Sequence, residues 1–256
     1  MENYRDLLIY FALKYKGDWK NIFKAISEKE KVDEEDIKKY LSTLTCKCIT
    51  ILDKEYPKQF KEIYQPPFVL FYYGDINLVN RKNILGIVGS RNPTTYGEQC
   101  CKYLLLESNI NDLVVISGLA KGIDAIAHET SLMKGYKTIA VLGNGIDACY
   151  PKENFKLYQK IKNNGLIISE YPYKEIVSKN NFALRNRIIA GLSNKILIPD
   201  VKKKSGTLIT IRFALNFGKD ILVVPCSIFD ERYNNQLIYE GAVPISTPKE
   251  LEREIN

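Results

Sequence analysis

Three short segments of the chain combine glycine with a hydroxyl side chain and a cation. They are Gly89-Ser90-Arg91, Ser117-Gly118 followed by Lys121-Gly122, and Lys204-Ser205-Gly206-Thr207. Glycine lets a ligand approach the backbone closely, and the first N–H groups of a helix have no partner within that helix. The positive end of the helix dipole favours a phosphate there, and a neighbouring Arg or Lys adds a full charge. The three segments therefore predict a phosphate-binding surface.

A fourth segment, residues 179–187, adds an aromatic ring to such cations. It reads Lys-Asn-Asn-Phe-Ala-Leu-Arg-Asn-Arg. Proteins bind single-stranded nucleic acids with cations on the backbone and aromatic rings against the bases. The candidate residues for binding a single-stranded nucleic acid are therefore Lys179, Phe182, Arg185 and Asn186. The same spacing also fits a core position for Phe182 and a carboxylate partner for Arg185, so both interpretations stay open at this point.

The sequence also limits the kind of phosphate ligand. It contains neither G-x-G-x-x-G after its first expected parallel strand nor G-x-x-x-x-G-K-[ST] anywhere. These motifs mark dinucleotide sites and P-loop nucleotide sites, respectively. A mononucleotide site remains open, but cations spread over several segments fit a longer row of phosphates better.

Catalytic groups are poorly represented. Asp124 and His128 lie four residues apart and share a helix face, but no second cluster of carboxylates accompanies them. Hydrolysis of nucleic acid normally needs such a cluster with metal ions, or a well-placed histidine. We expect His128 to be a structural residue bonded to nearby backbone or to Asp124. The pattern indicates a binding protein with no catalytic residue, cofactor or metal.

These segments need a scaffold that brings them together. From residue 84 on, short apolar runs alternate with helical stretches. Strands are expected at 84–88, 113–116, 137–142, 166–169, 195–198 and 220–224, and helices at 97–108, 123–134, 154–163, 184–192 and 207–217. Continuously apolar strands that alternate with helices are typical of a parallel sheet covered on both faces. We predict an α/β fold, an extended Rossmann-like doubly wound and mostly parallel sheet, whose strand ends carry the ligand site.

The first 45 residues follow another pattern, with apolar residues at helical spacing. We predict a small all-α module over residues 1–45 and a DNA-binding domain over residues 46–256. Residues 46–83 would connect the two, with short strands near 48–53 and 68–73.

The net charge of +7 belongs to the larger domain, because acidic and basic residues balance in the first 45 positions. This excess is compatible with a polyanionic partner. No run reaches the roughly 18 apolar residues of a membrane helix, and the first residues do not read as a signal peptide. We expect a cytoplasmic protein without a membrane partner. The six cysteines lack zinc-ligand spacing, so we expect most of them to act as small buried hydrophobic residues.

Taken together, these motifs resemble the DNA processing protein A (DprA, or Smf) family. The matching segments are GIVGSRNPTTYG (86–97), SGLAKGIDAIAHETSLMKGYKTIAVLGNGIDACYPKEN (117–154), GLIISEYP (165–172), FALRNRIIAGLS (182–193), KSGTLIT (204–210) and LIYEGA (237–242). They occur in the family's order. The helical start is similar in kind to the sterile-alpha-motif-like (SAM-like) domain of many members.

The resemblance implies a non-enzymatic protein of natural transformation and homologous recombination. Family members bind and protect incoming single-stranded DNA, form homodimers and load a RecA-type recombinase onto the strand. The resemblance places phosphates at the three glycine segments and a base against the ring of Phe182. Some members also end in a winged-helix domain; because this sequence stops at Asn256, we expect the form without it.

Two residues depart from the family pattern. Cys226 follows Pro225 where members often have glycine, and Tyr233 stands where a Gly-x-Asn is expected to begin. Both departures put the turn conformation at residues 225–235 in doubt. The main alternative function is a nucleotide-processing enzyme of the Rossmann-like phosphoribohydrolase type, although residues 205–210 lack the glutamate of that pattern. A nucleotide-sensing module is a third, weaker possibility.

Overall fold

The computed structural model describes residues 4–174 and 179–256. Its centre is a sheet with the strand order β1-β2-β6-β5-β4-β3-β7-β8-β9. The strands are β1 (Lys47–Thr50), β2 (Val69–Gly74), β3 (Ile84–Ile87), β4 (Val114–Ser117), β5 (Lys137–Leu142), β6 (Leu166–Ser169), β7 (Lys195–Ile198), β8 (Asp220–Val223) and β9 (Val243–Pro244). From β6 to β9 all neighbours are parallel, whereas β2 and β1 are antiparallel additions at one edge. The predicted doubly wound, mostly parallel sheet is confirmed.

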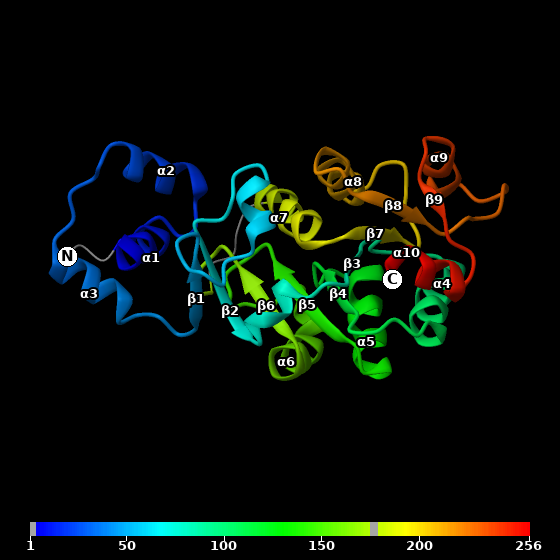
Figure 1. Cartoon of the computed structure of the whole chain (residues 1–256), viewed down its shortest axis with the longest axis horizontal. Helices are drawn as coiled ribbons and strands as arrows, with labels where there is room; N and C mark the ends of the chain where they lie inside the picture. Colours follow the sequence, from blue (N-terminus) through cyan, green and yellow to red (C-terminus); the bar gives the residue numbers. More distant parts are fainter. Residues whose placement is uncertain (1–3, 175–178) are drawn as a thin grey trace.

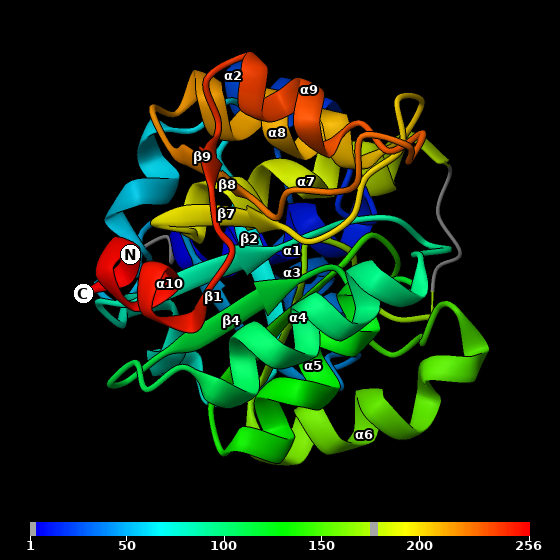
Figure 2. The same cartoon turned by 90° about the vertical axis from the view of Figure 1, so that its right-hand side faces the viewer.

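Helices cover both faces of this sheet (Figure 2). On one side lie α4 (Thr95–Glu107), α5 (Ile123–Lys134), α6 (Phe155–Asn164) and α10 (Pro248–Ile255); on the other lie α7 (Lys179–Leu192), α8 (Thr207–Asn216) and α9 (Asn234–Tyr239). Alternate strand residues point to opposite faces, so Ile84 joins the α7–α8 core while Leu85 joins the α4–α5 core. Burial on both faces explains why the strands read as continuous apolar runs.

Three short helices precede the sheet: α1 (Tyr4–Lys14), α2 (Trp19–Ser27) and α3 (Glu34–Leu41). They lie beside β1 and β2 at one end of the molecule (Figure 1). Their apolar residues share one core with residues of β2, β5, β6 and α6. The Trp19 indole also donates a hydrogen bond to the Pro66 carbonyl, at 2.8 Å. The helical region thus packs directly onto the edge of the sheet.

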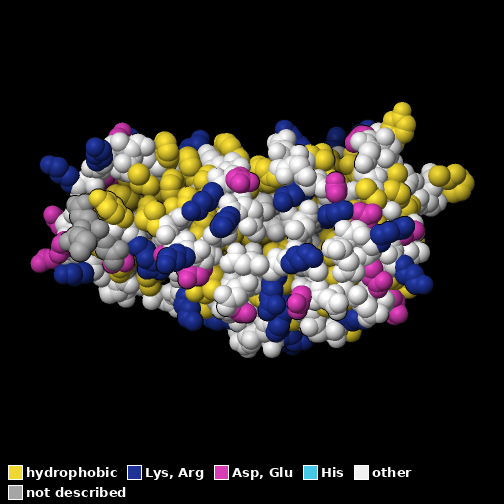
Figure 3. All heavy atoms as spheres, in the orientation of Figure 1, with side chains coloured by type: hydrophobic (Ala, Val, Ile, Leu, Met, Phe, Trp, Pro, Cys, Tyr) yellow, Lys and Arg dark blue, Asp and Glu magenta, His cyan; other side chains and the backbone are white. Residues whose placement is uncertain are grey.

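Not all apolar side chains of this region are buried. Phe23 and Ile26 of α2 are 50% and 38% exposed. Figure 3 shows apolar side chains gathered over α1 and α2 on that face of the molecule. No helix in residues 4–174 and 179–256 is long and apolar enough to span a membrane.

Candidate nucleic-acid interface

The strand order creates a natural crevice beside β3. From β3 the chain proceeds to β4, β5 and β6 on one side, and later returns to β7 on the other side. The helix after β3 therefore covers one face of the sheet and the helix after β7 covers the other. Loops that diverge in this way leave a crevice beyond the carboxyl ends of the strands, where α/β proteins bind ligands.

A cavity of about 370 Å³ lies in this crevice. Its walls come from the loops after β3 and β7 and from the first turns of α7. The lining residues are Val88, Gly89, Ser90, Arg91, Asn92, Ala120, Asp124, Phe182, Ala183, Arg185, Asn186, Lys202, Lys204, Ser205, Gly206, Thr207, Ile209 and Thr210. The structure thus brings together the predicted residues of the first, third and fourth segments, except Lys179. Lys179 begins α7, and its side chain lies outside the described part of the structure.

The backbone of Ser90 fixes the floor of the cavity. Its N–H donates to the Asp200 carbonyl at 2.8 Å, and its own carbonyl accepts from the Ile123 N–H at 3.1 Å. Three loops are therefore tied at one residue. The buried Ser90 hydroxyl accepts from the Asn92 N–H at 3.2 Å and shapes the turn that carries Arg91, whose side chain is exposed.

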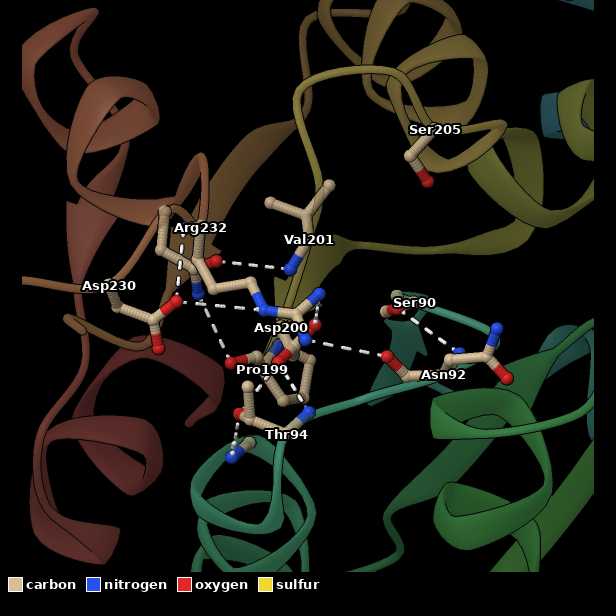
Figure 4. A network of polar contacts seen from close by, with 12 residues as sticks. Ser90, Asn92, Thr94, Pro199, Asp200, Val201, Ser205, Asp230 and Arg232 are labelled. Atoms are coloured by element: carbon tan, nitrogen blue, oxygen red, sulfur yellow. Dashed lines mark hydrogen bonds and ion pairs between the residues drawn. The ribbon is translucent and has the colours of Figure 1, made fainter. Parts of the chain in front are cut away.

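Asp200 holds the two sides of the crevice together, as Figure 4 shows. Its Oδ2 accepts from the N–H and the hydroxyl of Thr94, at 3.0 and 2.9 Å. Its Oδ1 lies 3.2 Å from Nη1 of Arg232, an ion pair without hydrogen-bond alignment. Both side chains are largely buried. The start of α4, the loop after β7 and the segment around Arg232 are thereby linked.

The beginning of α8 faces the same space. The Thr207 hydroxyl donates to the Gly89 carbonyl at 2.9 Å, and its N–H donates to the Ser205 hydroxyl at 3.2 Å. Gly206 has a φ of −61°, and nothing lies within 4 Å of the position that its Cβ would occupy. Lys204 is exposed beside it. A helix N-terminus with an adjacent cation is an arrangement that can hold a phosphate.

Arg185 supplies a buried positive charge at the back of the cavity. It is 4% exposed, and its Nη1 donates to the carbonyls of Gly118, at 2.7 Å, and of Val141. Burial lowers its pKa to about 10, although the Asp124 carboxylate acts in the opposite direction. The sequence left open a carboxylate partner for Arg185. The structure instead gives it main-chain carbonyls and the Asn186 side chain, with Asp124 acting through its field.

The second predicted segment has a different place. The buried Ser117 hydroxyl donates to the Ile87 carbonyl at 2.6 Å, so it is used within the sheet. A Cβ on Gly118 would lie 2.4–2.5 Å from the Arg185 guanidinium. Gly122 has a φ of +74°, and its Cβ would meet the Ser90 carbonyl at 2.3 Å. These three residues shape the loop behind the cavity and do not line it.

Lys121 belongs to the same segment and also lies outside the lining. It is exposed, and its Nζ forms an ion pair with Oε1 of Glu153 at 2.7 Å. This side of the loop faces the connection between β5 and α6. The predicted residues thus divide into a cavity group and a neighbouring surface group.

Phe182 forms part of the cavity wall and is half-buried. Its ring packs on Gly143, where a Cβ would come within 2.6 Å of it. The ring also contacts Tyr150, with centroids 5.4 Å apart and planes tilted by 53°. Phe182 is therefore neither a core residue nor a free ring, and part of it faces the cavity.

Asp124 is the carboxylate among the described lining residues. It is almost fully buried, and Oδ2 accepts from the N–H groups of Gly118 and Ala120, at 3.2 and 3.4 Å. Burial raises its pKa. Held by backbone in this way, it shapes the loop and carries a charge near Arg185.

His128 is structural, but its partner differs from those expected. Its Nδ1 lies 2.6 Å from the Thr138 hydroxyl, which itself donates to the Val115 carbonyl. Nδ1 therefore donates the proton. Burial lowers the pKa of His128 to about 3.

Sequence reasoning did not select several lining residues: Asn92, Asp124, Lys202, Ile209 and Thr210. Lys202 could have been found, since it begins the run of three lysines before Ser205. Asn92 could also have been found, because it directly follows Arg91. Asp124, Ile209 and Thr210 could not, because their exposure to the cavity depends on which faces of α5 and α8 point toward it. A second, neighbouring cavity of about 790 Å³ includes the selected Lys204, but sequence reasoning did not select its other residues, such as Phe229 and Arg232.

The two departures from the family pattern are accommodated without strain. Tyr233 has a φ of −87° in the right-handed helical region, and its N–H donates to the Val201 carbonyl at 2.9 Å. Cys226 exchanges hydrogen bonds with the Asn235 side chain through its own N–H and carbonyl. Neither position therefore needs glycine here.

Comparison with known proteins agrees with the geometry. The family model described as DNA recombination-mediator protein A matches residues 47–256. The DNA processing protein DprA of Bacillus subtilis is 39% identical over 209 residues, which cover 81% of this chain and 70% of that protein. The DprA of Streptococcus pneumoniae is 40% identical over 204 residues, covering 79% and 72%.

Solved structures give the same result. The crystal structure of Streptococcus pneumoniae DprA superposes with a TM-score of 0.80 at 34% identity and covers 98% of this chain and 93% of that one. A structure of Helicobacter pylori DNA processing protein A, which addresses its single-stranded DNA binding mode, superposes with a TM-score of 0.75 at 32% identity, covering 83% and 96%. The chain therefore belongs to the DNA recombination-mediator protein A family, also known as the DprA or Smf family.

Proposed function

We propose that this protein has a DNA-processing role, which it performs by binding single-stranded DNA in the crevice beside β3. The cavity carries this proposal, because it combines exposed Arg91, Lys202 and Lys204 with buried Arg185 and the ring of Phe182. Cations neutralise the backbone of a single strand, and an aromatic ring stacks on its bases. A duplex keeps its bases stacked inside, so the ring would contribute nothing to duplex binding.

The predicted DNA contacts form a track through the cavity and beside it. Arg91 with Gly89 and Ser90 forms the first, and Lys204 with Ser205, Gly206 and Thr207 forms the last. Between them Arg185, Asn186 and Phe182 line the cavity. Lys121 would hold a phosphate outside the cavity, with Ser117, Gly118 and Gly122 shaping its loop. Lys179 is a further predicted contact of this track.

We further propose that binding serves recombination without catalysis. In this role the protein protects incoming single strands during natural transformation and loads a RecA-type recombinase onto them. We also propose that it acts as a homodimer. Ile228 and Phe229 support a protein contact, because these neighbours in sequence are 85% and 91% exposed. Large exposed apolar side chains that lie near one another often mark interaction surfaces.

A salt titration tests the binding. Labelled oligo-dT and a duplex of equal length are titrated at several salt concentrations. The protein should prefer the single strand, with log affinity falling by about 0.7 per neutralised phosphate for each tenfold rise in salt. Arg91→Ala should weaken binding and flatten this slope, whereas Lys249→Ala, an exposed cation on α10, is the matched control. Equal affinity for both forms, or none, would overturn the proposal.

The recombination role has its own measurements. Sedimentation of the wild type should show a dimer, and Phe229→Ser should shift it toward the monomer. In a nucleation assay, the protein should shorten the lag before a RecA-type recombinase assembles on oligo-dT. An unchanged lag at saturating protein would contradict recombinase loading while leaving DNA binding in place.

A further inference from the structure

The connection between β5 and α6 places an exposed ring next to the cavity wall. This ring belongs to Tyr150, which is 56% exposed. Single exposed aromatic residues are common and need no explanation. Tyr150 differs because its ring contacts Phe182, the cavity's own aromatic residue, at 5.4 Å between centroids. The aromatic surface of the cavity therefore continues outward onto this connection.

The geometry of this pair determines where a base could stack. Rings at this distance are in direct contact, so no base fits between them. A base at the cavity would meet the accessible part of Phe182. The next base would meet the exposed part of Tyr150, outside the cavity.

The segment that carries Tyr150 is held at both ends. The Asn154 side chain donates to the carbonyls of Leu119 and Ala120, at 2.9 and 3.2 Å. The Asp147 carboxylate accepts hydrogen bonds from the hydroxyls of Thr45, at 2.7 Å, and Tyr73. The ring is thus presented by a fixed support, which limits the conformational entropy lost on binding.

The cations on this surface can bind a nucleic-acid backbone if a phosphate replaces Glu153 as the partner of Lys121. Lys121 is paired with Glu153, and their side chains are 54% and 64% exposed. Such an exposed pair stabilises a protein little, so a phosphate can replace the carboxylate. Lys152 on the same connection and Lys156 in the first turn of α6 are also exposed. This region therefore offers cations beside an aromatic ring, as single-strand sites do.

We propose that Tyr150 is a second base-stacking residue and that, with Lys121, it extends the single-strand track beyond the cavity onto the β5–α6 connection. Glu153 limits this extension by occupying Lys121 until a phosphate displaces it. The inference rests on the proposed single-strand binding. It names a contact that the cavity itself does not contain.

An oligonucleotide length series tests the extension. The base next to the one on Phe182 already reaches Tyr150, so the short ligand must offer a single base: thymidine 3′,5′-bisphosphate. The long ligand is a dT oligomer of about 16 nucleotides, which reaches past the cavity. Tyr150→Ala should weaken binding of the long oligomer about 5- to 150-fold, the range expected for one stacked base. Binding of the bisphosphate should not change, nor should the salt slope of the long oligomer. Tyr150→Phe should retain wild-type affinity, and Tyr103→Ala, a similarly exposed tyrosine on α4, is the control.

Glu153→Gln provides the second arm. It releases Lys121, so affinity for the long oligomer should rise several-fold while affinity for the bisphosphate is unaffected. A Tyr150→Ala variant that binds the long oligomer like wild type would overturn the inference. Equal losses for both lengths would also overturn it, because Tyr150 would then act only by supporting Phe182. If the wild type shows no preference for single strands, the proposed function itself fails.

Discussion

Replacing Gly206 by alanine separates what the fold requires from what a ligand requires. The residue precedes α8 with a φ of −61°, which any amino acid adopts, and its added Cβ would meet nothing within 4 Å. The folded chain therefore gives no reason for glycine at this position. A phosphate bound against the start of α8 would give one, because a methyl group would then stand between it and the backbone.

The two effects differ in size. Alanine restricts the unfolded chain, which stabilises the fold by about 0.4–1 kcal/mol, but it is a poorer residue than glycine before a helix by a similar amount. The free energy of unfolding should thus change by less than about 1 kcal/mol. Displacing a phosphate from one or two N–H donors should cost about 1.5–3 kcal/mol, which is roughly a 10- to 150-fold loss of affinity.

Urea unfolding and oligo-dT binding by fluorescence anisotropy measure both quantities. Gly218→Ala at the other end of α8 is the mirror-image control, since Gly218 is equally unobstructed but has a φ of +65°. It should lose about 1–2 kcal/mol of stability and keep its DNA affinity. If Gly206→Ala kept full affinity, the start of α8 would not be a phosphate site. A stability loss above 2 kcal/mol would show that our account of its backbone is wrong.

Three further changes test the scaffold. Gly118→Ala should cost about 1–3 kcal/mol in urea unfolding, because the new methyl group overlaps the held Arg185 guanidinium, and an unchanged midpoint would contradict this. Glu170→Gln should cost about 3–5 kcal/mol, since it leaves the fully buried Arg187 without its carboxylate partner at 2.6 Å, while DNA affinity of the folded protein persists. The pKa of His128 is lowered to about 3 in the folded state, so below pH 6.5 only the unfolded chain binds its proton and stability falls as the pH drops. Between pH 7 and pH 5 the wild type should lose about 2 kcal/mol more than His128→Gln, and parallel pH profiles would refute the assignment.

The fold was predictable because its parallel strands have a distinct sequence pattern. Each parallel strand is buried on both faces, so continuously apolar runs such as Ile84–Ile87 stand out between polar loops. The observed bounds differ by one or two residues for most elements. Helix α7 begins at Lys179 instead of residue 184, because its polar first turn has no apolar periodicity. The short α9 and β9 and the added helix α10 were not predicted, since their residues lack a long pattern.

The site was predictable in position and less so in detail. Strand ends of a parallel sheet converge, which is why the glycine segments after β3 and β7 were expected to meet. Sequence could not show which polar atoms the fold itself uses. Arg185 and Arg187 stand two residues apart, yet the first lines the cavity and the second donates to Gln65 and Glu170 in the interior. Only the packing of α7 distinguishes them.

The buried charge of Arg185 has a consequence for the lifetime of the protein. Its pKa of about 10 means that the folded chain keeps a cation where burial disfavours it. On the proposed function, a phosphate in the cavity relieves this disadvantage only in the folded state. Single-stranded DNA at 100 times its dissociation constant would then stabilise the fold by about 2.7 kcal/mol. Molecules engaged with DNA would therefore resist proteolysis about a hundredfold better than molecules without it.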